Sequence, residues 1–162
     1  HYPLRRQRQM CIRDRAQGAT RGLRYDPDMG LSVALSCSAA GIAWLSTMSD
    51  DEAMTLVAKK GLGKPEDFGP KAPTSIKGVM TLVKASRQQG FSMIVDVFGP
   101  GMSSMAAPVL DFQGRAIGVV TIAGPSVRLN AARMEALGPA LLEAAQEVSR
   151  ASTASSLFKK CA

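Results

Sequence analysis

The sequence predicts an α+β domain in which helices pack on one antiparallel sheet. Two observations support this prediction. The spacing of the apolar residues changes from helical to alternating at about residue 90. Three alternating segments then follow one another on connections of only three residues, and connections this short join antiparallel strands.

Two short strands are expected ahead of the helices, over 21–25 and 31–35, on either side of the turn signal DPDMG. A helix is expected next, beginning near Ser38 and ending near Met48. Its first turn consists almost entirely of small residues, and its bulky residues come later. Glycine is unfavourable inside a helix, so this small first turn needs a physical reason.

Two further helices are expected before residue 90. Ser49 and Glu52 have the spacing of a capping box, which predicts the start of the first. Thr74 is the expected cap of the second, and Gly90 ends it. The expected ranges are 50–59 for the first helix, 61–73 for a Gly- and Pro-rich loop, and 75–89 for the second helix. An apolar stripe on the second helix is formed by Ile76, Val79, Met80 and Val83.

The remaining elements complete the sheet and cover it. The three strands are expected over 91–98, 102–111 and 115–124. Asn130 is a suitable N-cap for a C-terminal helix that continues to about Arg150. We expect Pro139 to kink or restart this helix, because proline lacks the amide that a helix interior needs.

Composition bounds the class of protein. With 162 residues, 46% apolar and 20% charged, the chain is that of a globular domain, and no apolar run approaches the roughly 20 residues of a membrane span. The three cysteines are scattered and the one histidine is His1, so neither a disulfide framework nor a metal site nor a histidine-based catalytic triad is expected. We expect no cofactor, no membrane contact and a cytoplasmic location.

The net charge of +7 comes from the N-terminus. Residues 1–24 contain seven arginines and one acidic residue, whereas the rest of the chain is nearly neutral. A basic arm of this kind can bind nucleic acid, or it can be a solvated, disordered end. The stretch RQRQMCIRDR, residues 6–15, also resembles translated sequencing-adapter sequence. We therefore assign residues 1–20 to a disordered or artefactual tail, 21–152 to the domain and 153–162 to a frayed C-terminus.

Catalytic motifs are lacking, which argues against an enzyme. Cys37 and Ser104 are the candidate nucleophiles, but neither has a histidine base within the domain. Alternation places Met102, Ser104 and Ala106 on one face of their strand. Val119, Thr121 and Ala123 share a face of the next strand. If these faces coincide, they line a weakly polar cavity; the alternative is a core whose hydroxyls bond to backbone.

The small first turn over 38–41 also allows two explanations. Something apolar presses close to it, or its backbone amides are left bare for an anion. A bare helix N-terminus that faces Ser104 and Thr121 would be a site for a carboxylate, which it would bind without reacting. The first-turn residues proposed for this role are Ala39, Ala40 and Gly41.

Several segments together resemble the effector-binding domain of IclR-type bacterial transcriptional regulators. They are SAAGIAWLSTMSDDEA, PTS, GFSM, GMSSMAAPVLD, GVVTIAGP and LLEAAQEVS, and the resemblance runs from about Arg21 to about Arg150. It implies a GAF-like α+β domain that binds a small organic acid and forms homodimers or tetramers. In that family a winged helix-turn-helix precedes this domain and contacts operator DNA; we expect this chain to lack it.

The resemblance also implies positions for the effector. The amides near Ala39 and Ala40 would hold its carboxylate. The strand positions that face it would be Ile94, Met102, Ser104, Thr121 and Ala123, with Tyr25 and Val33 as further walls.

The sequence departs from some relatives, which have an Asp at the position of Ile94, a Cys at Ser104 and a Ser at Ala123. Asp96 is expected on the same strand face as Ile94, where it would substitute for the lost acid. The more apolar pocket predicts an acid larger or less polar than glyoxylate or pyruvate, for example an aromatic one. Two alternatives stay open: an enzyme or redox protein that uses Cys37 or Ser104 on a GAF-like scaffold, and a purely structural dimerisation module.

Overall fold

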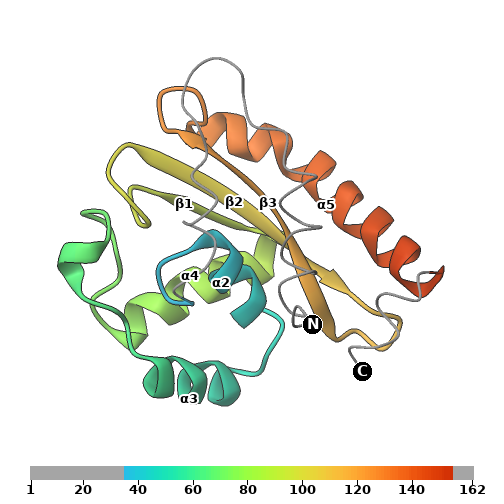
Figure 1. Cartoon of the computed structure of the whole chain (residues 1–162), viewed down its shortest axis with the longest axis horizontal. Coiled ribbons are helices and arrows are strands. Elements are labelled where there is room, and N and C mark those ends of the chain that lie inside the picture. The colour runs from blue at the N-terminus through green and yellow to red at the C-terminus, as the bar shows by residue number, and fades with distance from the viewer. Residues whose placement is uncertain (1–34, 155–162) are drawn as a thin grey trace, which may run out of the picture. The chain divides into compact units, whose positions relative to one another are not determined.

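The computed structural model describes residues 35–154, without the side chains of 153 and 154. The strands expected over 21–25 and 31–35 lie outside this range, except that Leu35 lies in a turn. The elements in chain order are α2 (Ala39–Leu45), α3 (Asp50–Lys60), the short 3-10 helix η2 (Pro65–Asp67), α4 (Ile76–Gln89), β1 (Ser92–Val95), β2 (Met102–Leu110), β3 (Ala116–Pro125) and α5 (Ala131–Ala154) (Figure 1). The predicted α+β class is confirmed.

The three strands form one antiparallel sheet in the order β1-β2-β3. Ile94 on β1 pairs with Ser104 on β2, which pairs in turn with Ala123 on β3. The register shifts by one residue between Val109 and Leu110, near the end of β2. Because side chains alternate along a strand, this register fixes which residues share each face of the sheet.

Helix α5 covers one face of the sheet. Met105 and Ala107 of β2 point toward it and are fully buried. They pack in one core cluster with Met134, Leu141 and Ala145 of the helix. This contact accounts for the alternation of the strands and for the helical spacing of the last apolar segment.

Helices α2, α3 and α4 lie on the other side. Ala39 and Ala43 of α2 pack against Ile94 and Ala106 of the sheet. A second cluster joins α2 to α3 and α4, and it consists of Ile42, Leu45, Ala53, Val57, Val79, Met80 and Val83. Helix α2 therefore lies between the sheet and the other two helices, held by apolar contacts on both of its sides.

Most of the expected helix boundaries are confirmed. Ser49 and Glu52 form the predicted capping box, and Asn130 caps α5 by accepting from the Arg133 amide at 2.9 Å. Gly90 ends α4 in the left-handed conformation at φ 84°. The cap of α4 was predicted wrongly, because Ser75 and not Thr74 accepts the Gly78 amide.

Helix α5 is continuous through Pro139, so the expected restart is wrong. A proline removes the amide that would bond to the carbonyl four residues earlier. That carbonyl belongs to Glu135, and both residues are exposed, so water can take the place of the missing donor. The helix also continues to Ala154, four residues beyond the expected end.

The first sheet strand is shorter than expected, because it ends at Val95 instead of residue 98. Asp96 has a positive φ of 56°, which turns the chain out of the strand. Its amide still donates to the Met102 carbonyl at 2.9 Å, and its Oδ1 accepts from the Gly101 amide at 2.8 Å. The prediction that Asp96 continues the strand face of Ile94 is therefore wrong.

Low pH is expected to destabilise the domain. Hydrogen bonds lower the pKa of three carboxyls: the Arg87 side chain acts on Asp50, the Ser49 amide on Glu52 and the Arg115 amide on Asp111. Their stabilising contribution is present above the unfolded-state pKa of about 4 and is lost as the pH falls through the lower folded-state pKa. The urea midpoint, followed by circular dichroism, should be constant from about pH 7 to 5 and fall below about pH 4. A midpoint that rises between about pH 4 and 3 would contradict this.

Candidate functional site

The small first turn of α2 is explained by close packing. A Cβ on Gly41 would lie 2.3 Å from the carbonyl oxygen of Leu35 and 2.5 Å from its Cα. Only glycine allows the backbone to pass this closely. Close packing, the first of the two explanations, is therefore correct for Gly41, although its neighbour is the backbone of Leu35 and not the apolar group that was expected.

The amide of Gly41 is also occupied. Ser38 is the N-cap of α2, and its Oγ accepts from the Gly41 amide at 3.0 Å. The Ser38 carbonyl accepts from the Ile42 amide at 3.0 Å. The expectation that Gly41 presents a bare amide is wrong, which leaves Ala39 and Ala40 as the first-turn candidates.

The predicted effector-facing strand residues do share one face of the sheet. Ile94, Ser104 and Ala123 are neighbours across the three strands. Thr121 pairs with Ala106, and Met102 pairs with Pro125. Because Ala106 and Ile94 pack against α2, this is the face that α2 covers; we call it the α2 face. The weakly polar faces of the last two strands therefore coincide, which is the condition that the sequence left open.

Burial on the α2 face decreases from β1 to β3. Ile94 is buried, Met102 and Ser104 are half-buried, and Thr121 and Ala123 are exposed. The face therefore has an apolar floor near α2 and an accessible, weakly polar end at β3. Its predicted further walls, Tyr25 and Val33, lie outside the described residues.

The carboxylate of Asp96 is engaged by two other groups. Its two oxygens are taken by the Gly101 amide and by the Lys71 ammonium, which lies 3.7 Å from Oδ2. The backbone pairs this turn with the loop before α4, because Gly69 donates to Val97 and Lys71 donates to Asp96, both at 2.9 Å. Asp96 thus helps to fix the loop in place, and both of its carboxylate oxygens already have partners.

Ser92 is a site-forming residue that sequence reasoning missed. Its side chain is 1% exposed, and its Oγ donates to the Ala39 carbonyl at 2.7 Å. This bond ties β1 to the first turn of α2 and so fixes the distance between the helix and the α2 face. The available signal was a serine at an inward-facing strand position, where a hydroxyl needs a partner.

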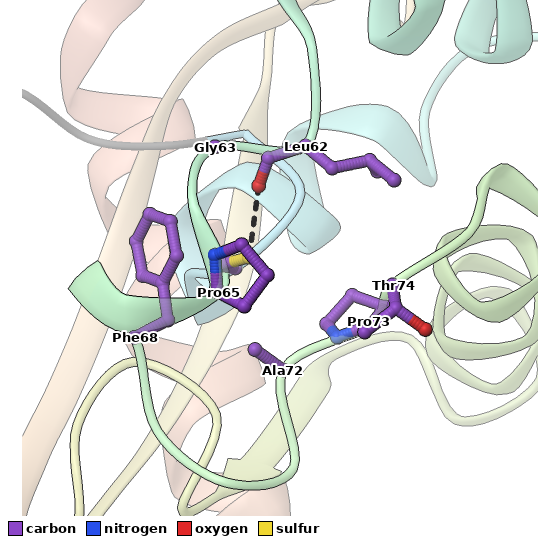
Figure 2. Close-up of a pocket in the computed structure, with 8 residues that line it drawn as sticks. Leu62, Gly63, Pro65, Phe68, Ala72, Pro73 and Thr74 are labelled. Carbon is purple, nitrogen blue, oxygen red and sulfur yellow. Dashed lines mark hydrogen bonds between the residues drawn. The ribbon is translucent and has the colours of Figure 1, made fainter.

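A small pocket lies between the start of α2 and the loop before α4. Figure 2 shows Leu62 and Gly63 at one side of it and Ala72 and Pro73 at the other. We call it the loop pocket; it is lined by Cys37, Leu62, Gly63, Pro65, Phe68, Ala72, Pro73 and Thr74. Its volume is about 90 Å³. Sequence reasoning identified this segment as a loop but found no pocket there.

Cys37 forms part of this pocket and is fully buried. Its Sγ donates to the Leu62 carbonyl at 3.5 Å, and burial raises the pKa of the thiol. A thiol held in the neutral form is a poor nucleophile. The chain's one histidine is His1, which lies outside the described residues, so residues 35–154 contain no imidazole base for Cys37 or Ser104. Within residues 35–154, no cluster of His, Cys, Asp or Glu could hold a metal ion.

A wider groove of about 750 Å³ lies where β3 leads into α5. Arg128 and Arg133 give it positive charge, and Ala123 belongs to its lining. Ala123 therefore lies at the boundary between this groove and the α2 face. The residues predicted to face the effector do not otherwise line it.

Bacterial relatives carry the names of transcriptional regulators. The HTH-type transcriptional regulator BhcR of Paracoccus denitrificans is 28% identical over 120 residues, which are 74% of this chain and 42% of BhcR. The chain thus spans less than half the length of this relative. These relatives are named as regulators, in line with the regulatory domain that the sequence predicts.

Solved structures share the fold. An IclR transcriptional regulator from Alicyclobacillus acidocaldarius matches with a TM-score of 0.69 and 22% identity, covering 83% of this chain and 52% of that one. The inducer-binding domain of PobR from Acinetobacter, a double mutant in complex with 3-hydroxybenzoic acid, matches with a TM-score of 0.63 and 20% identity. The match covers 79% of this chain and 67% of the PobR chain.

A family model identifies the family to which the chain belongs. None of the helices in the described part of the chain is long and apolar enough to cross a membrane. The family model for the bacterial transcriptional regulator IclR C-terminal domain matches residues 2–150. The chain belongs to this family, the IclR-type transcriptional regulators, and represents their C-terminal regulatory domain.

Proposed function

We propose that this chain is the effector-binding and oligomerisation domain of an IclR-type regulator, and that its effector is a small organic acid bound on the α2 face. The observation that carries the proposal is the row of Ile94, Ser104 and Ala123 across three neighbouring strands, next to the first turn of α2. Apolar walls with a few placed hydroxyls are typical of small-molecule sites.

The carboxylate would lie near the backbone of Ala39 and Ala40, with the hydroxyls of Ser104 and Thr121 as further partners. Backbone amides at the start of a helix attract anions because their N–H groups point outward. The solved PobR domain, which has the same fold, holds 3-hydroxybenzoic acid. That complex supports a carboxylic acid as the class of ligand here.

The α2 face favours an acid that is less polar than glyoxylate or pyruvate. Ile94 and Ala123 supply no hydrogen bond, and the carboxylate of Asp96 is engaged with Gly101 and Lys71. A ligand rich in polar groups would leave those groups unpaired on this surface, which costs binding free energy.

Operator DNA and a second subunit are the further partners that we propose. The family resemblance places DNA binding in an N-terminal winged helix, and homodimers or tetramers would bring two such elements to one operator. Effector binding would then act by changing the geometry of the oligomer. Contact with operator DNA would occur in the bacterial cytoplasm, which is the location that we propose.

A screen that pairs each acid with its primary amide tests the proposal. Thermal unfolding of the full chain should shift upward with at least one acid, by roughly 10 °C at a hundredfold excess over its Kd. The matching amide, which lacks the charge, should give no shift. Equal shifts from acid and amide would contradict a carboxylate site. No shift from any acid would favour a structural dimerisation module.

A substitution on the α2 face should weaken binding without unfolding the domain. Ala123 is exposed at the accessible end of the face, so Ala123→Leu places a bulky side chain in the ligand's space. It should weaken the binding of the acid that has the highest affinity in the screen by at least about tenfold, or 1.4 kcal/mol. Isothermal titration calorimetry measures this.

Ala58→Leu is the matched control for that substitution, because Ala58 is exposed on α3, away from the sheet. It should leave the affinity within about twofold of the parent value, a difference of about 0.4 kcal/mol. Equal affinities of Ala123→Leu and the parent protein would exclude the α2 face as the binding surface.

A further inference from the structure

The side of α5 that points away from the sheet carries a line of exposed residues. Arg133, Ala136, Ala140, Glu147 and Ala151 recur at intervals of three, four or seven residues, so they lie on one side of the helix, and all five are exposed. We call this side the outer face of α5. Its centre consists of the two alanines at 136 and 140, and small residues allow a second helix to approach closely.

The two ends of the outer face carry opposite charges. Arg133 lies near the start of the helix, and Glu143 and Glu147 lie in its second half. None of these three side chains forms an ion pair with another residue of the described range. Arg133 and Glu147 each lie seven residues from Ala140. A second copy of α5 laid antiparallel across Ala140 would therefore bring each Arg133 to the Glu147 of the other copy, which makes the face complementary to itself.

The groove between β3 and α5 adjoins the start of this face. Arg133 lines it, together with Leu137 and with Val127, which is 87% exposed. Val148 is 39% exposed and lies eleven residues after Leu137, about three turns, on the same side of α5. A two-fold axis perpendicular to two antiparallel helices keeps that side common to both. Val148 of one copy would therefore lie over the apolar wall of the other copy's groove.

The charge of the groove selects among the segments that could fill it. Residues 1–24 contain seven arginines and one acidic residue, and residues 159–162 contain two lysines and no acidic residue. Arg128 and Arg133 in the groove would repel both of these ends of the chain. The second half of α5, with Glu143 and Glu147, brings the opposite charge, so it is the better occupant.

We propose that two copies of this chain dimerise through the outer face of α5, packed antiparallel about a two-fold axis at Ala140, with Val148 of each copy in the groove of the other. The proposal rests on the oligomerisation part of the proposed function and names the surface that performs it. An interface in which one patch pairs with itself closes at two subunits. Because α5 and α2 cover opposite sides of the sheet, the α2 face stays accessible in this dimer.

Charge reversal tests the pairing. Glu147→Arg places an arginine opposite Arg133 of the second copy, and Arg133→Glu places two carboxylates opposite each other. Each variant should raise the dissociation constant of the dimer by at least about tenfold, measured by sedimentation equilibrium of the full chain at low salt. The double variant Arg133→Glu/Glu147→Arg restores opposite charges and should return the constant to within about threefold of the parent value.

Glu135→Arg is the matched control for the reversals. It makes the same change of charge on the same helix, but Glu135 is five residues from Ala140, which is about 140° around the helix and off the outer face. It should keep the parent dissociation constant. Removal of a charge without reversal, as in Arg133→Met, takes away only an exposed ion pair and should change the constant by no more than about threefold.

The outcomes separate this proposal from the proposed function. Single reversals that leave the constant unchanged, a double variant as weak as the single ones, or an equal loss in Glu135→Arg would overturn pairing through α5 and leave oligomerisation through another surface intact. A parent chain that stays monomeric at every concentration would overturn both the α5 pairing and the oligomerisation part of the proposed function. The acid–amide screen tests the acid-binding part independently.

Discussion

Gly41→Ala should destabilise the domain by about 3 kcal/mol, although the same change inside a helix usually stabilises by up to about 1 kcal/mol. The added methyl would meet the backbone of Leu35, with the carbonyl oxygen at 2.3 Å and the carbonyl carbon at 2.7 Å. Backbone atoms cannot rotate away as a side chain can. Urea unfolding followed by circular dichroism measures the loss, which corresponds to a fall in Tm of roughly 10 °C.

Gly118→Ala is the matched control for this prediction. Gly118 lies within β3, and no heavy atom of the described residues lies within 4 Å of the position of its Cβ. The variant should be as stable as the parent protein or slightly more stable, because alanine reduces the entropy of the unfolded chain. Parent-like stability of Gly41→Ala would show that the turn at Leu35 does not press on α2.

Arg87→Met should cost about 2 kcal/mol of unfolding free energy, because this guanidinium closes the connection between α2 and α3. Its Nε donates to the Ser46 carbonyl at 3.1 Å and its Nη2 to the Met48 carbonyl at 2.6 Å, and Nη1 pairs with Asp50. Methionine keeps the apolar stem and leaves both carbonyls without this donor. Chemical denaturation measures the change.

Two further variants test whether the loss of stability comes from the contacts of the Arg87 guanidinium. Arg87→Lys should recover part of the stability, because one ammonium can reach one of the three partners but cannot reproduce the planar fork. Arg133→Met, at an exposed position of α5, should change stability by less than about 0.5 kcal/mol. If Arg87→Met loses no more unfolding free energy than Arg133→Met, the Arg87 guanidinium does not stabilise the connection between α2 and α3.

Local signals allowed the helix starts and the faces of the sheet to be predicted. The capping box of Ser49 and Glu52 needs only residues that are close in sequence, as does the left-handed end of α4 at Gly90. The common face of Ser104 and Ala123 follows from alternation and short connections, because each fixes the register of the next strand.

Features that depend on distant contacts could not be predicted in the same way. The sequence shows that Gly41 is small, but only the fold shows that Leu35 passes over it. Asp96 alternates correctly with Ile94, yet its side chain is drawn to the Gly101 amide and the strand ends before it. The loop pocket forms because Leu62 and Ala72 lie next to Cys37, which is far from them in the sequence. The spacing of apolar residues does not predict a contact of this kind.

The candidate site was thus partly predictable. Alternation placed Met102 and Ser104 on one face of their strand and Thr121 and Ala123 on one face of the next, and the resemblance added Ile94. The structure brings these five residues to one face of the sheet, beside α2. The first turn of α2 was overinterpreted, because the Ser38 cap takes the Gly41 amide and packing accounts for the glycine. Binding on this face therefore has to be tested at the sheet as well as at the helix.

The most direct test of acid binding on the α2 face is an NMR titration. The acid with the highest affinity in the screen is added to the isotope-labelled chain, and the nitrogen–proton correlation spectrum is followed. We predict saturable shifts at the amides of Ala39, Ala40, Ile94, Ser104 and Ala123, with the signals of α3 unchanged. Saturable shifts confined to the groove between β3 and α5, around Arg128 and Arg133, would contradict the account.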